Sequence, residues 1–256
     1  MRLLNTHLFA FCLFYSSFSF ATTITLAYSD IESYPYQLGN GNYTPEPPGL
    51  SLDILNQVAV QLNIKIKYFR LPGKRVLDYI ESGDVDGGFI FSYNSTRAQY
   101  AQYPMKGTIP DGEKRIATLG YYFYKLKGQP LEWDGVNFSK LENHFIAAHL
   151  GFSITSKLKQ NNIKVHEAKT TEQLFAMLRS RRIEAIAIQN TIAQEYLRDK
   201  PWSDEIEQVL PAITTKDYFL IFNQNFARSN QDLVNQIWLV ISEIRDKVIL
   251  EKNDKY

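Results

Sequence analysis

The sequence predicts an α/β protein that folds as two lobes of similar design. From residue 24 onwards, segments with the spacing of strands alternate with segments with the spacing of helices, as in α/β sheet proteins. A helix, a serine, a triplet of apolar, acidic and small residues, and the start of a strand occur in residues 77–87 and again in residues 175–185. Such a repeat indicates two lobes, although any helix-turn-strand unit has a similar pattern.

In the first half of the chain, the apolar residues mark strands and helices in alternation. A short alternating or continuous apolar run indicates a strand, and apolar residues three or four positions apart indicate a helix. The expected elements are a strand at 24–28, a helix with Leu52, Leu55, Val58 and Leu62 on one face, a strand at 64–69, a helix at 74–82 and a buried strand at 87–91.

The second half repeats this alternation. We expect a strand at Phe145–His149, a helix after Gly151, and a strand at 183–188. Between them, Thr170 and Gln173 have the spacing of a capping box that opens a further helix. Near the end, a strand at 218–222 precedes a long helix that Ser229 is expected to cap. The apolar residues that form the inner face of this helix are Leu233, Ile237, Val240, Ile241, Ile244 and Val248.

Residues 1–21 have the features of a cleaved secretory signal peptide. Arg2 supplies a positive charge, residues 3–20 are mostly apolar, and Ser19, Phe20 and Ala21 form a small-residue cleavage pattern. A membrane anchor is the alternative, but polar residues interrupt the stretch and leave little continuous apolar length for crossing a bilayer. We therefore expect a periplasmic protein of about 235 residues, which are ample for one or two hydrophobic cores.

Charge and cysteine content narrow the function further. The chain has 28 basic and 27 acidic residues, and removing Arg2 with the signal peptide leaves a net charge near zero. This balance argues against a nucleic-acid partner and against strong electrostatic attachment to a membrane. The single cysteine, Cys12, lies in the signal peptide, so the mature chain has no thiol with which to bind a metal. We expect no metal and no cofactor, and a monomer.

Three segments carry a resemblance to one family of binding proteins. Residues 48–55 open a helix, residues 82–87 form a helix-to-strand turn, and residues 92–97, followed by Tyr103-Pro104, have a characteristic serine, threonine and arginine spacing. In this order they resemble the polar amino-acid type of periplasmic solute-binding protein, solute-binding protein family 3, which feeds ABC importers. The resemblance covers nearly the whole mature chain.

The resemblance implies a type II periplasmic binding protein fold with a ligand cleft between two α/β lobes. The first lobe is expected to be discontinuous, formed by residues 22–115 and 216–256, and the second to comprise residues 116–215. Two hinge strands would cross between the lobes near residues 112–119 and 211–217. The ligand would contact both lobes only when they are closed.

The same resemblance supplies the main candidate binding residues. Arg97 matches the arginine that binds the ligand's carboxylate in the family, and a planar guanidinium suits this task because it donates two parallel hydrogen bonds. Ser92 precedes it, next to Phe91. In the second lobe, Ser153 follows Phe152 at a helix start, where backbone amides and the helix dipole favour an anion.

One departure from the family affects the choice of ligand. At the position of Gln189, amino-acid binders of the family carry an aspartate that pairs with the ligand's ammonium group, so a standard α-amino acid is in doubt. A carboxylate without an ammonium group, or an amino acid whose ammonium meets Asp30, Glu32 or aromatic rings, fits the sequence better. Tyr34 and Tyr36 follow in the same loop as candidate walls of the site.

Arg75, at the start of a helix in the first half, is a candidate for the rim of the site. We therefore expect ligand-binding roles for Arg97, Ser92, Ser153, Gln189, Tyr34, Tyr36, Asp30, Phe91, Arg75 and Phe152.

The expected function is periplasmic binding of a small polar solute, with an ABC permease as the partner. Two alternatives remain open: sensing of a ligand for a membrane receptor, and a dehydratase-like enzyme that acts on cyclic acids. An enzyme needs a general acid or base in the cleft, for which Asp30, Glu32 and His149 are the candidates. Because each of these has an ordinary structural explanation, we expect a protein that is not an enzyme.

Overall fold

One nine-stranded sheet runs through the protein, which is described here from a computed structural model that covers residues 22–139 and 145–256. The signal peptide expected at residues 1–21 lies outside the described residues. The strands follow the order β11-β10-β12-β7-β13-β3-β1-β2, and β4 also pairs with β13. They are β1 (Thr23–Ser29), β2 (Lys65–Leu71), β3 (Gly87–Ser92), β4 (Ala101–Gln102), β7 (Ala117–Leu126), β10 (Phe145–His149), β11 (Lys164–Ala168), β12 (Ala185–Gln189) and β13 (Ile206–Asn223).

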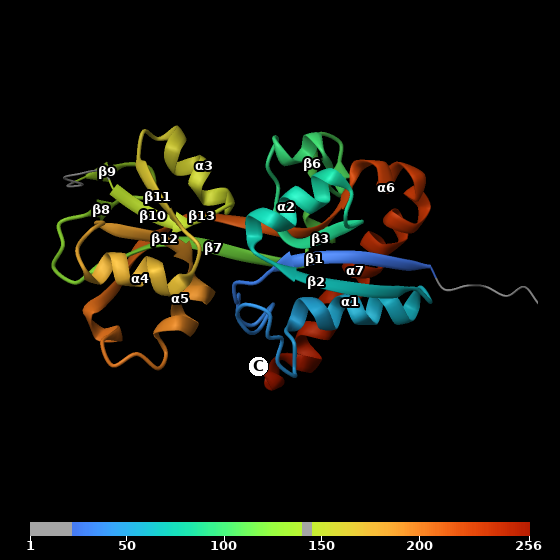
Figure 1. Ribbon diagram of the computed structural model, residues 1–256, viewed down its shortest axis with the longest axis horizontal. Coiled ribbons are helices and arrows are strands. Elements are labelled where there is room, and N and C mark those ends of the chain that lie inside the picture. The colour runs from blue at the N-terminus through green and yellow to red at the C-terminus, as the bar shows by residue number, and fades with distance from the viewer. Residues whose placement is uncertain (1–21, 140–144) are drawn as a thin grey trace, which may run out of the picture.

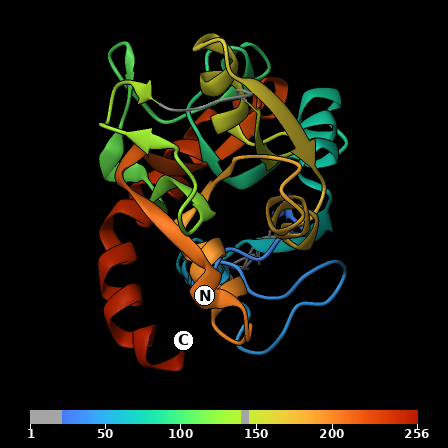
Figure 2. The ribbon, with the colours of Figure 1, turned by 90° about the vertical axis from the view of Figure 1, so that its left-hand side faces the viewer.

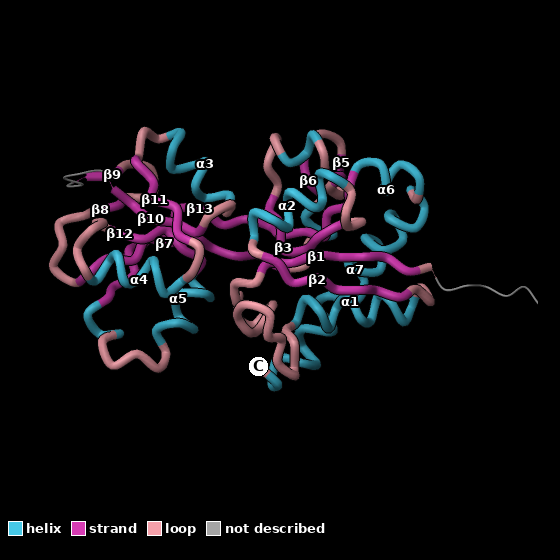
Figure 3. Tube along the Cα trace, in the orientation of Figure 1, coloured by secondary structure: helices cyan, strands magenta, loops and turns pink. Residues whose placement is uncertain are grey.

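Helices cover this sheet, and two small hairpins lie beside it (Figure 3). The helices are α1 (Leu50–Gln61), α2 (Gly73–Ser82), α3 (Ser153–Gln160), α4 (Thr171–Arg179), α5 (Asn190–Leu197), α6 (Gln224–Ser229) and α7 (Gln231–Lys252). The hairpins pair β5 (Met105–Lys106) with β6 (Ile109–Pro110) and β8 (Glu132–Trp133) with β9 (Phe138–Ser139). Among the helices of the described ranges, none is long and apolar enough to cross a membrane.

The elements form two lobes, and the long strands β7 and β13 run from one lobe into the other (Figure 1). Strand β7 pairs with β12 of the second lobe through residues 121–124, whereas β13 pairs with β3 of the first lobe through residues 218–222. The two strands also pair with each other in antiparallel register. The connections between the lobes are thus part of the sheet itself.

In the first lobe, helices pack on both faces of the sheet. Helices α1 and α7 (α7 is red in Figure 2) lie on one face, where Leu26, Leu55, Phe89 and Ile241 are buried together. On the other face, α2 contributes Val76 and Ile80 to a second apolar cluster. The predicted inner face of α7 is confirmed, because Ile237, Val240, Ile241, Ile244 and Val248 are buried and Leu233 packs against the same core. The C-terminal helix therefore belongs to the first lobe.

The second lobe has the same three-layer design. Strand β12 is buried along its whole length, which fits its continuous apolar sequence. Ile154 and Leu158 of α3 pack on one face, and Leu174 and Leu178 of α4 pack on the other. The Thr170 hydroxyl accepts a hydrogen bond from the backbone N–H of Gln173 at 3.1 Å, as a capping box requires.

Two sequence predictions need correction. Ser229 does not cap the long helix, because it is the last residue of the short helix α6 and α7 begins at Gln231. Asn223 ends β13 and caps α6 by accepting hydrogen bonds from the backbone N–H groups of Asn225 and Phe226. The strand expected at 218–222 is also only the end of β13, whose first half at Ile206 belongs to the second lobe. Half-buried Glu207 and Gln208, followed by exposed Leu210 and Pro211, break the apolar alternation that would mark a strand in that half.

Two features lie along the strands that connect the lobes. One is an interruption in the pairing of β13 with β7, and the other is a buried arginine that contacts the chain just before β7. Pairing of β13 with β7 shifts between Val209 and Thr214, and residues 210–213 leave the ladder there. Next to β7, the guanidinium of Arg245, which is 3% exposed, donates hydrogen bonds to the carbonyls of Glu113 at 2.7 Å and Arg115 at 3.0 Å. Helix α7 therefore fixes the entry of the chain into β7.

We expect Arg245→Met to lower the free energy of unfolding by about 2 kcal/mol, because two carbonyls in a partly buried site lose their charged donor. Urea denaturation measures the change. The matched control is Arg228→Met on the exposed surface of α6, which should change stability by less than about 0.5 kcal/mol. Equal effects of the two substitutions would contradict the role assigned to Arg245.

Candidate functional site

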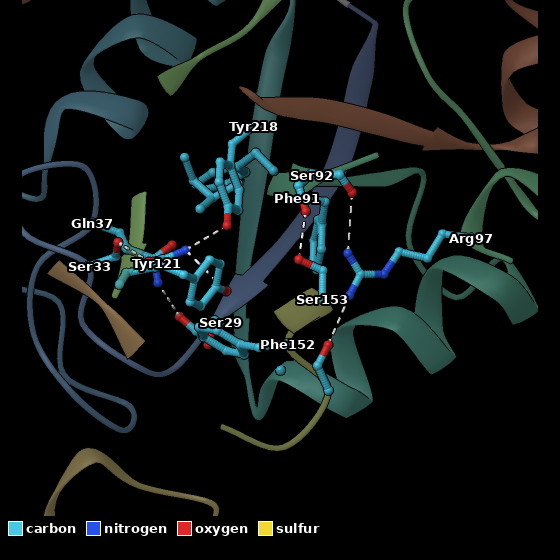
Figure 4. A pocket seen from close by; sticks show the side chains of 15 residues that line it. Ser29, Ser33, Gln37, Phe91, Ser92, Arg97, Tyr121, Phe152, Ser153 and Tyr218 are labelled. Carbon is cyan, nitrogen blue, oxygen red and sulfur yellow. Dashed lines mark hydrogen bonds between the residues drawn. The ribbon is translucent and has the colours of Figure 1, made fainter. Parts of the chain in front are cut away.

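A small cavity lies between the lobes, where β3 of the first lobe faces the start of α3 in the second (Figure 4). Its volume is about 40 Å³, which is room for roughly three water molecules. The candidate residues that line it are Phe91, Ser92, Arg97, Phe152, Ser153 and Gln189. The structure thus brings together six of the residues chosen from the sequence, three from each lobe.

Arg97 is positioned by the turn that follows β3. The side-chain oxygen of Asn94 accepts hydrogen bonds from the backbone N–H groups of Thr96 and Arg97, which fixes the start of this turn. The guanidinium is almost fully buried and donates to the carbonyl of Gly151 at 2.9 Å and to that of Ser92 at 3.3 Å. Since Gly151 belongs to the second lobe, Arg97 holds the two lobes together.

Hydroxyl groups and a lysine surround this guanidinium. The hydroxyls of Ser92 and Ser153 are 2.9 Å apart across the lobe boundary, and Lys216 Nζ donates to Ser153 Oγ at 3.3 Å. Burial lowers the pKa of Lys216, and the nearby positive charges of Lys157 and Arg97 lower it further. Several cations therefore converge on this end of the cavity, which gives it a positive potential suited to an anion.

The opposite end of the cavity is polar and uncharged. Gln189 Nε2 donates to the hydroxyl of Tyr218 at 3.0 Å and to that of Tyr121 at 3.5 Å, while its Oε1 accepts from Ser33 Oγ at 3.2 Å. Gln37 lines the same end and is 2% exposed. Gln189 therefore links the two lobes through neutral hydrogen bonds.

The backbone that lines the cavity is irregular at two points, in β3 and at Gly151. Two residues of β3, Phe89 and Ile90, oppose one residue of β13, which is a β-bulge. Ile90 has a φ of 63°, an uncommon conformation for a β-branched residue. Strained residues of this kind cluster at functional sites, and Ile90 lines the cavity. Gly151 has a φ of 79° and brings its carbonyl to Arg97.

Four of the residues chosen from the sequence lie outside the cavity lining. Tyr36 packs against the apolar cluster around β7, and the Tyr34 ring faces the guanidinium of Arg198 at 6.0 Å. Arg75 is exposed on α2. Asp30 lines a separate outer pocket of about 510 Å³ between the lobes. From the loop after β1, it is Ser33 and Gln37 that line the cavity in place of the two tyrosines.

The outer pocket is rich in acidic residues. Five carboxylates line it, and two lysines oppose them: Asp30, Glu32, Glu172, Glu195, Asp199, Lys169 and Lys200. Burial raises the pKa of Asp30, and the positive charges of Arg70 and Arg75 offset part of this effect. Within residues 22–139 and 145–256, no group of three or more histidine, cysteine, aspartate or glutamate side chains is arranged to hold a metal ion.

His149 is buried at the end of β10. Its Nε2 lies 3.2 Å from the hydroxyl of Thr171, and its ring packs on Phe152. Burial lowers the pKa of His149 to about 3, so the imidazole is neutral at physiological pH. Since His149 does not line the cavity, its position fits a structural residue better than an acid or base.

Several residues of the site could not be recognised from their local sequence. Tyr121 and Tyr218 lie on the crossing strands, and nothing distinguishes them from the other tyrosines among the 16 of the chain. Ser33 and Gln37 follow Asp30 in a loop whose path depends on contacts with β2 and α1. Lys216 lies within the expected crossing segment 211–217, but no motif distinguishes it from the other lysines of the chain.

We expect the burial of His149 to make folding stability depend on pH. The unfolded chain gains a proton on this residue near pH 6.5, whereas the folded protein does so only near pH 3. The contribution of His149 to stability is therefore complete above pH 6.5 and is lost as the pH falls, by about 2 kcal/mol between pH 7 and pH 5.

Urea denaturation at these two pH values tests this expectation. His149→Gln keeps a hydrogen-bonding group near Thr171 but cannot titrate, so its stability should fall less on acidification. The control is His166→Gln at an exposed position, which should keep the dependence of the wild type. The expectation fails if His149→Gln and the wild type lose equal stability.

Comparison with known proteins identifies the fold. No protein-family model and no curated protein sequence matches the chain. Among solved structures, the ligand-binding core of GluR0 from Nostoc punctiforme in complex with L-glutamate is similar, with a TM-score of 0.67, 18% identity, and coverage of 88% of this chain and 97% of that chain. An ancestral arginine-binding protein bound to glutamine has a TM-score of 0.68 and 16% identity, with 91% and 98% covered.

A histidine kinase sensor domain with similarity to periplasmic binding proteins has a TM-score of 0.72 and 13% identity, with 89% of this chain and 92% of that chain covered. Identities this low establish the fold and leave the ligand open. The chain has the two-lobed α/β fold of type II periplasmic binding proteins.

Proposed function

We propose that the protein binds a small polar solute through a carboxylate held by Arg97 between the lobes. One observation carries this proposal: among the described residues that line the cavity, Arg97 is the only charged one. Lys216 adds a second positive charge through its contact with Ser153. A buried cation without a counter-ion is costly, and a carboxylate would supply two acceptors for its guanidinium.

Binding is coupled to closure of the lobes. The guanidinium of Arg97 and the hydroxyls of Ser92 and Ser153 reach across the boundary, so a solute placed among them contacts both lobes at once. Such a solute binds the closed form better than an open one and shifts the population towards it. The hinge would lie in the crossing strands near residues 112–119 and 211–217, where the pairing of β13 is irregular.

A transport role is supported by the fold and by the predicted signal peptide. One similar solved structure is the substrate-binding protein of an amino acid ABC transporter, with a TM-score of 0.66 and 16% identity. We propose periplasmic delivery of the solute to an ABC importer. Sensing is the second candidate, favoured by the likeness to a histidine kinase sensor domain. Uptake of the labelled solute by cells that lack the gene separates these roles. Only the transport role predicts that these cells lose uptake.

Catalysis is not favoured by the geometry. The candidate carboxylates Asp30 and Glu32 line the outer pocket, and His149 lies behind Phe152. Among the described residues of the cavity lining, none is an aspartate, glutamate or histidine that would act as a general acid or base. A thermal-shift screen of amino acids, short carboxylic acids and cyclic acids identifies the solute, since a ligand of the folded state raises the melting temperature.

For the best ligand of that screen, we expect Arg97→Ala to weaken binding by about 2 to 5 kcal/mol, the usual cost of removing one partner of a buried charge pair. Isothermal titration calorimetry measures the change. The control is Arg75→Ala on the exposed surface of α2, which should leave affinity nearly unchanged. Unchanged affinity in Arg97→Ala would refute the proposed site.

A further inference from the structure

A buried acceptor without a donor lies at the uncharged end of the cavity. Gln37 is 2% exposed and lines the cavity, and its Oε1 accepts no hydrogen bond from the described residues. Figure 4 shows Gln37 beside Ser33, at the end of the cavity away from Arg97. Leaving a buried carbonyl oxygen unpaired is unfavourable, because the oxygen has lost its hydrogen bonds to water and gained none in exchange. A ligand that donates a hydrogen bond there recovers this free energy.

The orientation of the Gln37 amide is fixed by its neighbours. Its Nε2 donates to the backbone carbonyls of Ile31 at 2.5 Å and Ser29 at 3.3 Å. Rotating the amide by 180° would place Oε1 against these two carbonyl oxygens, where it has no donor. The atom of the Gln37 amide that has no partner is therefore the oxygen, which accepts a hydrogen bond, and not the nitrogen, which donates one.

The neighbouring amide does not share this property. Gln189 has partners on both polar atoms, because Ser33 donates to its Oε1 and its Nε2 donates to Tyr218. Gln37 has partners on its nitrogen alone. Among the buried side-chain nitrogen and oxygen atoms of the described cavity lining, Gln37 Oε1 is thus the one that has no hydrogen-bond partner.

The donor that fits this atom is uncharged. An ammonium group buried here would need a carboxylate partner, and among the described residues of the lining there is none. Arg97 and Lys216 already make the opposite end positive, so a second cation would be repelled. A hydroxyl or amide N–H supplies the hydrogen bond without this electrostatic cost.

We propose that Gln37 selects solutes in which the carboxylate is accompanied by a neutral hydrogen-bond donor, such as a hydroxy acid or an amide-bearing acid, over the corresponding α-amino acids. This inference rests on the proposed function, because it takes the carboxylate to lie at Arg97. It assigns Gln37 the role of a specificity-determining residue.

Two matched series of acids test the proposal in the purified protein. The first is propionate, lactate and alanine, and the second is glutarate, 2-hydroxyglutarate and glutamate. Within each series the substituent changes from hydrogen to hydroxyl to ammonium while the carbon skeleton stays the same. In the wild type, titration calorimetry should show the hydroxy acid binding about tenfold more tightly than the unsubstituted acid. The amino acid should bind no more tightly than the unsubstituted acid.

Substitution of Gln37 should remove this preference. In Gln37→Met, the hydroxy acid should bind no more tightly than the unsubstituted acid, because the acceptor is lost while Arg97 remains. The control is Gln61→Met at an exposed position on α1, which should keep the tenfold preference. Gln37→Glu preserves the size of the side chain and adds a negative charge, so the amino acid should gain affinity relative to the hydroxy acid. This second variant provides the test if Gln37→Met fails to fold.

The results separate this inference from the proposed function. If acids bind in a manner that depends on Arg97, but the wild type prefers the amino acid or Gln37→Met keeps the preference for the hydroxy acid, the role of Gln37 is wrong and the carboxylate site stands. If no acid of either series binds and the thermal-shift screen finds no other carboxylate ligand, both proposals are refuted.

Discussion

The buried guanidinium of Arg97 is the group around which the two lobes are arranged. Among its described contacts, backbone carbonyls from both lobes accept its hydrogen bonds, and the Phe91 ring lies 5.5 Å from its central carbon. Carbonyl dipoles compensate a buried positive charge only in part, since full compensation requires an opposite charge. The hydroxyls of Ser92 and Ser153 carry no charge and Lys216 is itself a cation, so none of them compensates the positive charge of Arg97. An anion that entered, as the proposed function requires, would therefore meet groups that are already in place.

In the proposed closure, the crossing strands would carry the motion of the lobes. Strands β7 and β13 are paired on both sides of the irregular segment 210–213, so closure would require only a local bend of this pair. Arg245 ties the start of β7 to α7, which limits bending to the junction between the lobes. Hinge closure of this kind concentrates changes in backbone angles in a few residues and leaves both cores intact.

Local sequence patterns predicted much of the fold and about half of the site. Arg97 and Ser92 could be chosen because residues 92–97 resemble a segment of a known family of binding proteins. Gln37 and Tyr218 could not, because their place in the cavity depends on contacts between segments far apart in the sequence. Tyr34 and Tyr36 lie in the expected loop, but their contacts with Arg198 and with the apolar cluster around β7 join segments far apart in the sequence.

The direct contacts between the lobes also set a limit on affinity. The Ser92–Ser153 and Arg97–Gly151 hydrogen bonds occupy the same donors and acceptors that a solute would use. The second lobe therefore acts as an internal competitor, and the apparent dissociation constant is the intrinsic constant divided by the fraction of molecules in which these groups are free. Substitutions that strengthen or weaken these contacts between the lobes would then change the affinity, even where the substituted residue does not contact the ligand.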